Sequence, residues 1–417
     1  MQTHLADFIK GTPAGDEAEA ILRKCVHCGF CNAVCPTYQL LGSELDGPRG
    51  RIYLIKQALE GAPATERTRL HLDRCLTCRA CEPACPSGVQ YGRLADIGRA
   101  VIEERVPRGR MDRLYRTVLG FVLPSARRFG AILALARAFR PLLPESLARR
   151  IPLPRPGVRP TLAGDAAARH MLVLGGCVQS SLAPSINAAA ARVLKRRGIT
   201  LFEAEGAGCC GAVRYHLNQQ ADGLDDMRRL IDAWWPLIEA QNVEAIVITA
   251  SGCGVTVKDY AQLLEGDPQY REKAAHVSRI ARDLVEVLES EFEVDEGMRT
   301  RAAALGPGVF QSPCTLQHGQ RLGGRVEALL GNAGFQLLPV ADGHLCCGSA
   351  GTYSLLQSEI SGQLRERKLD ALRAGGPEWI ATANIGCMTH LAEVSGTPVK
   401  HWVEILDEVG TANLRTG

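Results

Sequence analysis

The sequence predicts a mixed α and α/β architecture, in which an α-helical N-terminal domain precedes two related α/β domains. Three observations lead to this prediction. Eight cysteines lie between Cys25 and Cys85, and the stretch that separates them into two groups has helical periodicity. Eight further cysteines recur in two similar halves beyond residue 165. In both halves short apolar runs alternate with helical stretches, which is typical of a mostly parallel sheet.

The composition of the 417-residue chain is that of an ordinary globular protein, with 46% hydrophobic and 22% charged residues. The net charge of +3 gives no indication of nucleic-acid binding. The N-terminus lacks the apolar stretch of a secretion signal, and no window reaches the ~18 uncharged apolar residues of a membrane-spanning helix. Sixteen cysteines in such a chain indicate metal or redox chemistry, and we expect a cytoplasmic location.

Residues 1–105 contain two cysteine motifs of identical spacing. The pattern Cys-x-x-Cys-x-x-Cys-x-x-x-Cys-Pro, which is the ligand pattern of bacterial ferredoxins, begins at Cys25 and again at Cys75. Three closely spaced thiolates hold one cubane cluster, and the fourth cysteine, which precedes proline, reaches the other. The predicted 4Fe–4S ligands are Cys25, Cys28, Cys31 and Cys85 for cluster 1, and Cys75, Cys78, Cys81 and Cys35 for cluster 2. Structural zinc and disulfides are the alternatives, but zinc sites use cysteine pairs rather than evenly spaced triplets.

The stretch between the two motifs is predicted to be a helix. Within PRGRIYLIKQALEG, Ile52, Ile55 and Leu59 fall on one face, and Gly61 follows as a stop signal. We therefore expect an α-helical ferredoxin domain. We interpret the apolar face as core rather than as a cofactor contact.

Residues 106–165 are predicted to be a basic connector. Between residues 106 and 160 there are twelve Arg, no Lys and only two acidic residues, and the prolines of IPLPRPGVRP favour an extended linker. Residues 111–143 predict two short helices that are broken at Pro124. In the second, arginines flank a broad apolar surface formed by Phe129, Ile132, Leu133, Leu135, Ala136, Phe139 and Leu143. We favour packing on this protein's own domains or on a partner subunit. The alternative is peripheral contact with the cytoplasmic face of the inner membrane.

Residues 166–290 and 291–417 repeat one cysteine pattern. In each repeat a cysteine precedes Cys-Cys-Gly by 32 positions, and a Gly-Cys follows. We call the two sets quartet 1 (Cys177, Cys209, Cys210 and Cys253) and quartet 2 (Cys314, Cys346, Cys347 and Cys387). These cysteines follow apolar runs such as LVL, AIVIT and WIAT, so we expect them at strand ends, where open α/β sheets bind ligands.

The duplicated pattern resembles the CCG (cysteine-rich) domain of heterodisulfide reductases and of the iron–sulfur subunits of glycolate, lactate and glycerol-3-phosphate dehydrogenases. With the ferredoxin motifs, the resemblance covers nearly the whole chain outside residues 106–160. GAGCCGAVRYHLN, ASGCGVTVKDYAQLL and NIGCMTHL most resemble the iron–sulfur subunits of glycolate oxidase (glycolate dehydrogenase). The resemblance implies an electron-relay subunit whose FAD-containing partner subunits oxidise glycolate to glyoxylate, with a quinone as electron acceptor.

The quartets depart from one pattern within this family. The unusual clusters of heterodisulfide reductases use both vicinal cysteines and a closing Cys-x-x-Cys. In this sequence Thr256 and His390 occupy the closing positions, three residues after Cys253 and Cys387. We therefore expect at most one ordinary four-ligand site per repeat, with quartet 2 as the third metal site and quartet 1 as the fourth. A cluster, another metal, a vicinal disulfide and inert buried thiols all remain open interpretations of the quartets.

The substrate chemistry is expected to lie outside this chain. No Gly-x-Gly-x-x-Gly opens a helix after a strand, and removal of hydride from a hydroxy acid needs a flavin or nicotinamide. We expect FAD only in the partner subunits, no catalytic residue here, and little activity from the isolated chain. One alternative is the same relay role in lactate or glycerol-3-phosphate oxidation. A second is a catalytic subunit of the heterodisulfide-reductase type, against which the missing closing cysteines argue.

Overall fold

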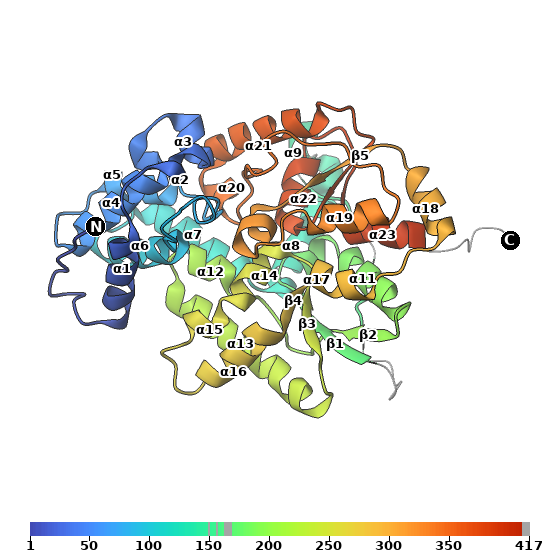
Figure 1. Ribbon diagram of the computed structural model, residues 1–417, viewed down its shortest axis with the longest axis horizontal. Helices are drawn as coiled ribbons and strands as arrows, with labels where there is room; N and C mark the ends of the chain where they lie inside the picture. Colours follow the sequence, from blue (N-terminus) through green and yellow to red (C-terminus); the bar gives the residue numbers. More distant parts are fainter. Residues whose placement is uncertain (149–150, 156, 162–168, 411–417) are drawn as a thin grey trace.

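The computed structural model describes residues 1–148, 151–155, 157–161 and 169–410. A helical N-terminal domain lies at one end of the molecule, and the two α/β repeats lie side by side at the other (Figure 1). The connector helices run between them and contact both. This is the predicted combination of an α-helical domain with two parallel α/β repeats. The residue boundaries given above for the four segments stay predictions.

Short helices joined by the two cysteine loops form the N-terminal domain. They are α1 (Pro13–Lys24), α2 (Phe30–Ala33), α3 (Pro36–Leu41), η1 (Glu44–Asp46), α4 (Pro48–Leu59), α5 (Glu66–Asp73) and α6 (Tyr91–Arg105). The predicted apolar face of α4 is core, because Ile52, Ile55 and Leu59 are all buried. Gly61 follows the helix with φ +93°, a left-handed conformation that glycine adopts at little cost. A separate apolar core thus holds the two cysteine loops in place.

Two helices separated at Pro124, as predicted, begin the connector, and two short helical segments follow them. These segments are α7 (Arg110–Val122), α8 (Ala126–Phe139), η2 (Arg140–Leu142) and α9 (Glu145–Ala148). The apolar residues of α8 divide between two faces: Leu133 is buried, whereas Ile132, Leu135 and Phe139 are each more than half exposed. The sequence interpretation placed them on one broad surface, because periodicity cannot separate an apolar residue that contacts protein from one that faces outward. Among the described residues no single helix is long and apolar enough to span a membrane, although α7 and α8–η2, bent by 103°, meet the criteria as a pair.

The first repeat is a four-stranded parallel sheet covered by helices. Its strand order is β2-β1-β3-β4, with Met171 of β1 paired to Leu201 and to Ala245. The strands are β1 (Arg169–Val173), β2 (Ile199–Phe202), β3 (Ala245–Ile248) and β4 (Ala281–Asp283). The helices are α10 (Gln179–Leu182), α11 (Ser185–Lys195), α12 (Ala212–His216), α13 (Gln220–Ala240), α14 (Ser251–Lys258), α15 (Tyr260–Leu263), α16 (Arg271–Ile280) and α17 (Leu284–Glu291). All four residues of β3 are buried, which is typical of a central parallel strand.

The second repeat has the same strand order as the first, but the strand at one edge of its sheet is reduced to a single bridge. Its sheet is β5-β6-β7, and Leu337 adds a single bridge beside Gly308 of β5. The strands are β5 (Gly308–Gln311), β6 (Trp379–Thr382) and β7 (Val399–His401). The helices are α18 (Glu296–Ala303), η3 (Thr315–Gly319), α19 (Arg325–Asn332), α20 (Tyr353–Leu356), α21 (Ser358–Arg373), α22 (Ile385–Ala392) and α23 (Trp402–Gly410). The expectation that Cys346 and Cys347 follow a full strand is therefore wrong. Pro339 follows two residues after the bridge, and its ring fixes φ and removes an N–H, which disfavours continuation of a strand.

Helices of the two repeats pack against each other across a shared apolar core. The last helix of the second repeat, α23, packs on α11 of the first, and α17 of the first packs on α19 of the second. One apolar cluster contains residues from both sheets and from these helices. The contact is reinforced where Asp407 pairs with Arg192 and Arg196, and where the ring Nε2 of His401 lies 2.8 Å from the carbonyl oxygen of Thr249. The two repeats therefore fold as one body.

Candidate iron–sulfur sites and the cysteine quartets

The two ferredoxin loops have the same unusual backbone. In the first, His27 and Gly29 have φ +60° and +88°; in the second, Thr77 and Arg79 have φ +53° and +58°. Left-handed conformations are costly for residues other than glycine, and most of all for a β-branched residue such as Thr77. Such strain is concentrated at functional sites, where the surrounding fold imposes it. Here the left-handed residues lie between the first and third cysteines of each loop.

Cys85 of the second motif joins the three cysteines of the first. Burial, and then the neighbouring thiols Cys25, Cys28 and Cys85, raise the pKa of Cys31 to about 11. The same four cysteines, together with Cys81 of the second motif, line a small hollow at the first loop. The Nε2 of His27 also lies beside this hollow, buried and without a hydrogen-bond partner in the described residues. A ring nitrogen in that position fits as a donor to the sulfur of a cluster.

Cys35 of the first motif joins the three cysteines of the second. Burial raises the pKa of Cys81, and the thiols Cys78, Cys75 and Cys35 raise it further. Cys35 precedes Pro36 at the start of α3, which carries it away from its own loop. The structure thus places the fourth cysteine of each motif beside the three cysteines of the other motif, as the motif predicts. The assignment of these eight residues as cluster ligands stays a prediction, and a 4Fe–4S cluster fits both groups.

Two buried arginines distinguish the second group. Arg51 is 1% exposed and donates to the carbonyl oxygen of His71 and to Thr37; Arg99 donates to the carbonyl oxygens of Leu72 and Cys75. Burial acts to raise the pKa of Cys75, but the positive charges of Arg51 and Arg99 outweigh it and the pKa is lowered. The N–H of Thr77 and the hydroxyl of Tyr91 also donate to the Cys75 sulfur. These charges and donors fit the net negative charge that four thiolates give a cluster.

Sequence reasoning missed Arg51, although a signal was present. Arg51 precedes Ile55 by four positions and Ala58 by seven, so it lies on the buried face of α4. An arginine at core spacing is rare, because a buried charge requires partners. Its partners are Asp46, 3.7 Å away, and the Thr37 hydroxyl, neither of which local sequence predicts.

Each quartet is brought together by the fold. In quartet 1, Cys177 and Cys210 donate hydrogen bonds to Cys209, which lower its pKa well below the usual value. In quartet 2, Cys346 and Cys387 do the same for Cys347. Each thiolate also accepts from backbone N–H groups that follow the pair, as the N–H of Ser349 illustrates for Cys347. The two repeats thus favour the anion on different members of their vicinal pairs.

The glycine of each Cys-Cys-Gly has a structural reason. Gly211 and Gly348 have φ +86° and +87°. A Cβ at either position would lie 2.5 Å from a backbone oxygen, that of Gly223 and of Ser361 respectively. The glycine therefore lets α13 pack directly against the first pair and α21 against the second.

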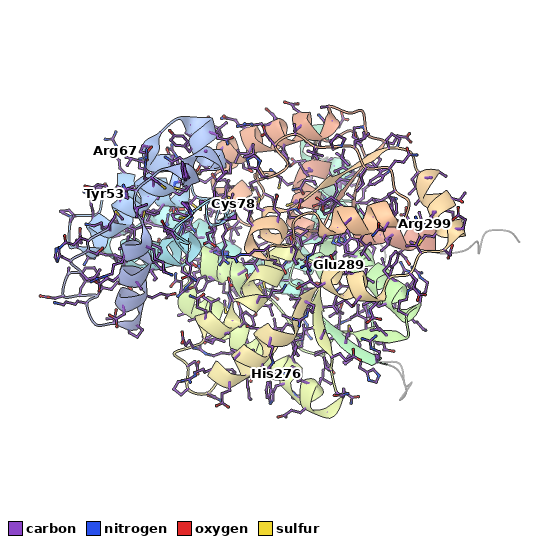
Figure 2. The ribbon with its side chains drawn as sticks, in the orientation of Figure 1. Tyr53, Arg67, Cys78, His276, Glu289 and Arg299 are labelled. Carbon is purple, nitrogen blue, oxygen red and sulfur yellow. The ribbon has the colours of Figure 1, made fainter. Side chains whose placement is uncertain are left out.

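Quartet 2 lies directly against the second ferredoxin group. Cys314 is the thiol that contributes most, after burial, to the raised pKa of Cys78. Leu76, Cys314 and Cys346 belong to one small apolar cluster that joins the N-terminal domain to the second repeat. Figure 2 shows Cys78 at this junction.

Among the described residues no three His, Cys, Asp or Glu side chains converge on a single metal ion. Metal binding by either quartet stays a prediction, tested by whether anaerobically prepared protein holds more iron than two 4Fe–4S clusters require.

Comparisons with known sequences agree with this description. Residues 21–89 match the 4Fe-4S dicluster domain, and residues 171–258 and 309–392 each match the CCG cysteine-rich domain. The chain is therefore an iron–sulfur protein that combines a 4Fe-4S dicluster domain with a duplicated cysteine-rich domain.

Relatives that match along most of the chain show which family within this class the chain belongs to. The chain is 51% identical to the glycolate oxidase iron–sulfur subunit of Escherichia coli (strain K12), over 98% of this chain and 99% of the relative. It belongs to the family of glycolate oxidase iron–sulfur subunits. It is also 30% identical to the probable glycolate oxidase iron–sulfur subunit of Bacillus subtilis (strain 168), over 90% of this chain and 89% of that one. Lactate utilization protein A of an Exiguobacterium strain is 28% identical over 56% of this chain and 94% of its own length.

Proposed function

We propose that this chain is the electron-relay subunit of a flavin-dependent glycolate dehydrogenase, taking electrons from an FAD-containing partner subunit and passing them toward a quinone. The observation that carries the proposal is the pair of cysteine groups in one small domain, in a chain that matches a glycolate oxidase iron–sulfur subunit along its length. When bound, two 4Fe–4S clusters would supply one-electron carriers, held by Cys25, Cys28, Cys31 and Cys85 and by Cys35, Cys75, Cys78 and Cys81.

The positions of the two cysteine groups favour one direction of transfer. At the first group Cys28 is exposed, and Val26 and Phe30 beside it are 69% and 64% exposed. Tyr53, on α4, lies at the outer edge of the domain (Figure 2). The second group lies inside, against the repeats. An apolar exposed surface around the first group suits the docking of a flavoprotein, so electrons would enter there and leave from the second group.

The isolated chain is expected not to oxidise glycolate, because it has no recognisable flavin or nicotinamide site. With the FAD-containing partners present, glycolate should reduce its clusters, as read from paramagnetic resonance and bleaching of visible absorbance. Adding glycolate to the clusters without the flavoprotein is the control. Turnover by the single purified chain would contradict the proposal. Faster cluster reduction by lactate, for which the likeness to lactate utilization protein A gives a reason, would change the substrate and keep the relay.

The outward face of the connector supports a location at the cytoplasmic face of the inner membrane. Met111, Phe121, Ile132, Leu135 and Phe139 on α7 and α8 are all more than half exposed. Arginines lie beside them, and apolar side chains with adjacent positive charge favour an anionic lipid surface.

The complete complex is therefore expected to sediment with vesicles of anionic lipid. The double variant Leu135→Glu with Phe139→Glu should reduce the bound fraction at least about tenfold, because two apolar contacts are replaced by repelled charges. The double variant Leu45→Glu with Leu70→Glu, at two exposed residues of the N-terminal domain, is the matched control. Equal sedimentation of both variants would assign the face to a partner subunit instead.

A further inference from the structure

A cavity of about 1090 Å³ lies where the N-terminal domain, the connector and both repeats meet. Its walls are Cys75 and Thr77 of the second ferredoxin loop, Phe129 and Leu133 of α8, and Tyr353 and Met388 of the second repeat. The volume is in the upper range of cavities that hold organic cofactors and ligands. Most of its lining is apolar, but charged and polar side chains also line it, among them Arg99, Arg155, His216 and Asn384.

His216 is the polar side chain best placed to hold a ligand there. It ends α12, lines the cavity, and is exposed to that space rather than buried in side chains. Within the described part of the chain neither of its ring nitrogens makes a hydrogen bond. Burial, followed by the charges of Arg99 and Arg79, lowers the pKa of His216 to about 4, so the ring is neutral near pH 7. A neutral imidazole donates one hydrogen bond and accepts another.

The neighbours of His216 link this polar end to the second ferredoxin group. Arg99, whose charge acts on His216, donates to the carbonyl oxygen of Cys75 at 2.7 Å and to the Thr77 hydroxyl at 2.9 Å. A ligand that accepts a hydrogen bond from His216 would therefore lie beside the loop that carries Cys75. Another wall of the cavity is formed by α8, which also carries the exposed Ile132 and Leu135.

We propose that this cavity binds a quinone, with His216 as hydrogen-bond donor to one ring carbonyl beside the Cys75 loop and the apolar tail along α8. The inference rests on the proposed function, because that function supplies the electrons. Oxidation of glycolate to glyoxylate releases two electrons and two protons, and reduction of a quinone to its quinol consumes the same number. No bond to the protein forms or breaks. A largely apolar chamber with the neutral donor His216, between a cluster loop and an outer helix with exposed apolar residues, suits a lipid-soluble carbonyl acceptor.

A photoreactive short-chain azidoquinone tests the site on the assembled complex with its flavoprotein partners. Light should attach the label to residues lining the cavity, as located by mass spectrometry. His216→Ala is expected to weaken labelling about tenfold, which corresponds to one lost hydrogen bond. His276→Ala is the control, because His276 lies on α16 at the far side of the first repeat (Figure 2).

A second pair of variants tests the cavity itself and is independent of His216. Ala136 lines the cavity from α8, whereas Ala134 on the same helix is exposed. Ala136→Trp should place an indole in the chamber beside α8 and weaken labelling, and Ala134→Trp should leave labelling unchanged. Label confined to the partner subunits, or labelling unaffected by both His216→Ala and Ala136→Trp, would overturn the inference. Should Ala136→Trp fail to fold, the His216 pair decides. Glycolate-driven reduction of a water-soluble dye by the wild-type complex reports the relay separately, so failure of the proposed function is recognised by loss of dye reduction.

Discussion

Replacing Cys35 with serine is expected to remove the cluster of the second motif, although Cys35 belongs to the first. The reason is its position beside Cys75, Cys78 and Cys81, reached because Pro36 directs the chain into α3. A serine oxygen is a poor substitute for a thiolate at iron, so about half of the iron should be lost. Iron and acid-labile sulfide analysis, with paramagnetic resonance of the reduced protein, measures the loss.

Double variants make this prediction sharper. If the fourth cysteines are exchanged, Cys28→Ser combined with Cys35→Ser damages both clusters, whereas Cys28→Ser combined with Cys85→Ser damages only one. If each motif instead held its own cluster, these two results would be reversed. The two double variants carry the same number of lost thiols, so they control for each other.

Replacing Arg51 with methionine is expected to lower both the stability of the protein and the reduction potential of the second cluster. The side chain is fully buried, pairs with Asp46 and donates to the Thr37 hydroxyl and the carbonyl oxygen of His71. Breaking a buried pair from one side costs about 3 kcal/mol in the free energy of unfolding. Because reduction adds negative charge to a cluster, loss of a nearby buried cation should lower the potential by on the order of tens of millivolts.

Arg49→Met is the matched control, two positions earlier in α4. Arg49 is about one-third exposed and pairs with the exposed Glu44, so its loss should cost about 1 kcal/mol or less. Denaturant unfolding of the loaded protein and a potentiometric titration followed by paramagnetic resonance provide the two measurements. If the reduction potential of the second cluster is unchanged in Arg51→Met, then Arg99 and the hydrogen-bond donors to Cys75 determine that potential without a contribution from Arg51.

Much of this molecule is determined by local sequence. The spacing of the eight N-terminal cysteines predicts both loops, because three thiols separated by two residues can surround one cluster corner by corner. The apolar spacing in α4, the break at Pro124 and the buried runs at β1, β3 and β6 all appear where periodicity predicts them. These features depend on residues a few positions apart, so a linear pattern records them. The duplication is visible for the same reason, since each repeat keeps its own cysteine spacing.

The tertiary structure alone decided which distant residues meet. No local pattern indicates that α23 packs on α11, that Cys314 approaches Cys78, or that His216 faces a cavity with Cys75. The division of the α8 apolar residues between an inner and an outer face also follows from what packs against the helix. Such contacts join positions far apart in the chain, and their free energy comes from burial and charge in the assembled fold. The sequence therefore determines the cysteine loops, whereas the assembled fold determines which charges, thiols and empty space surround them.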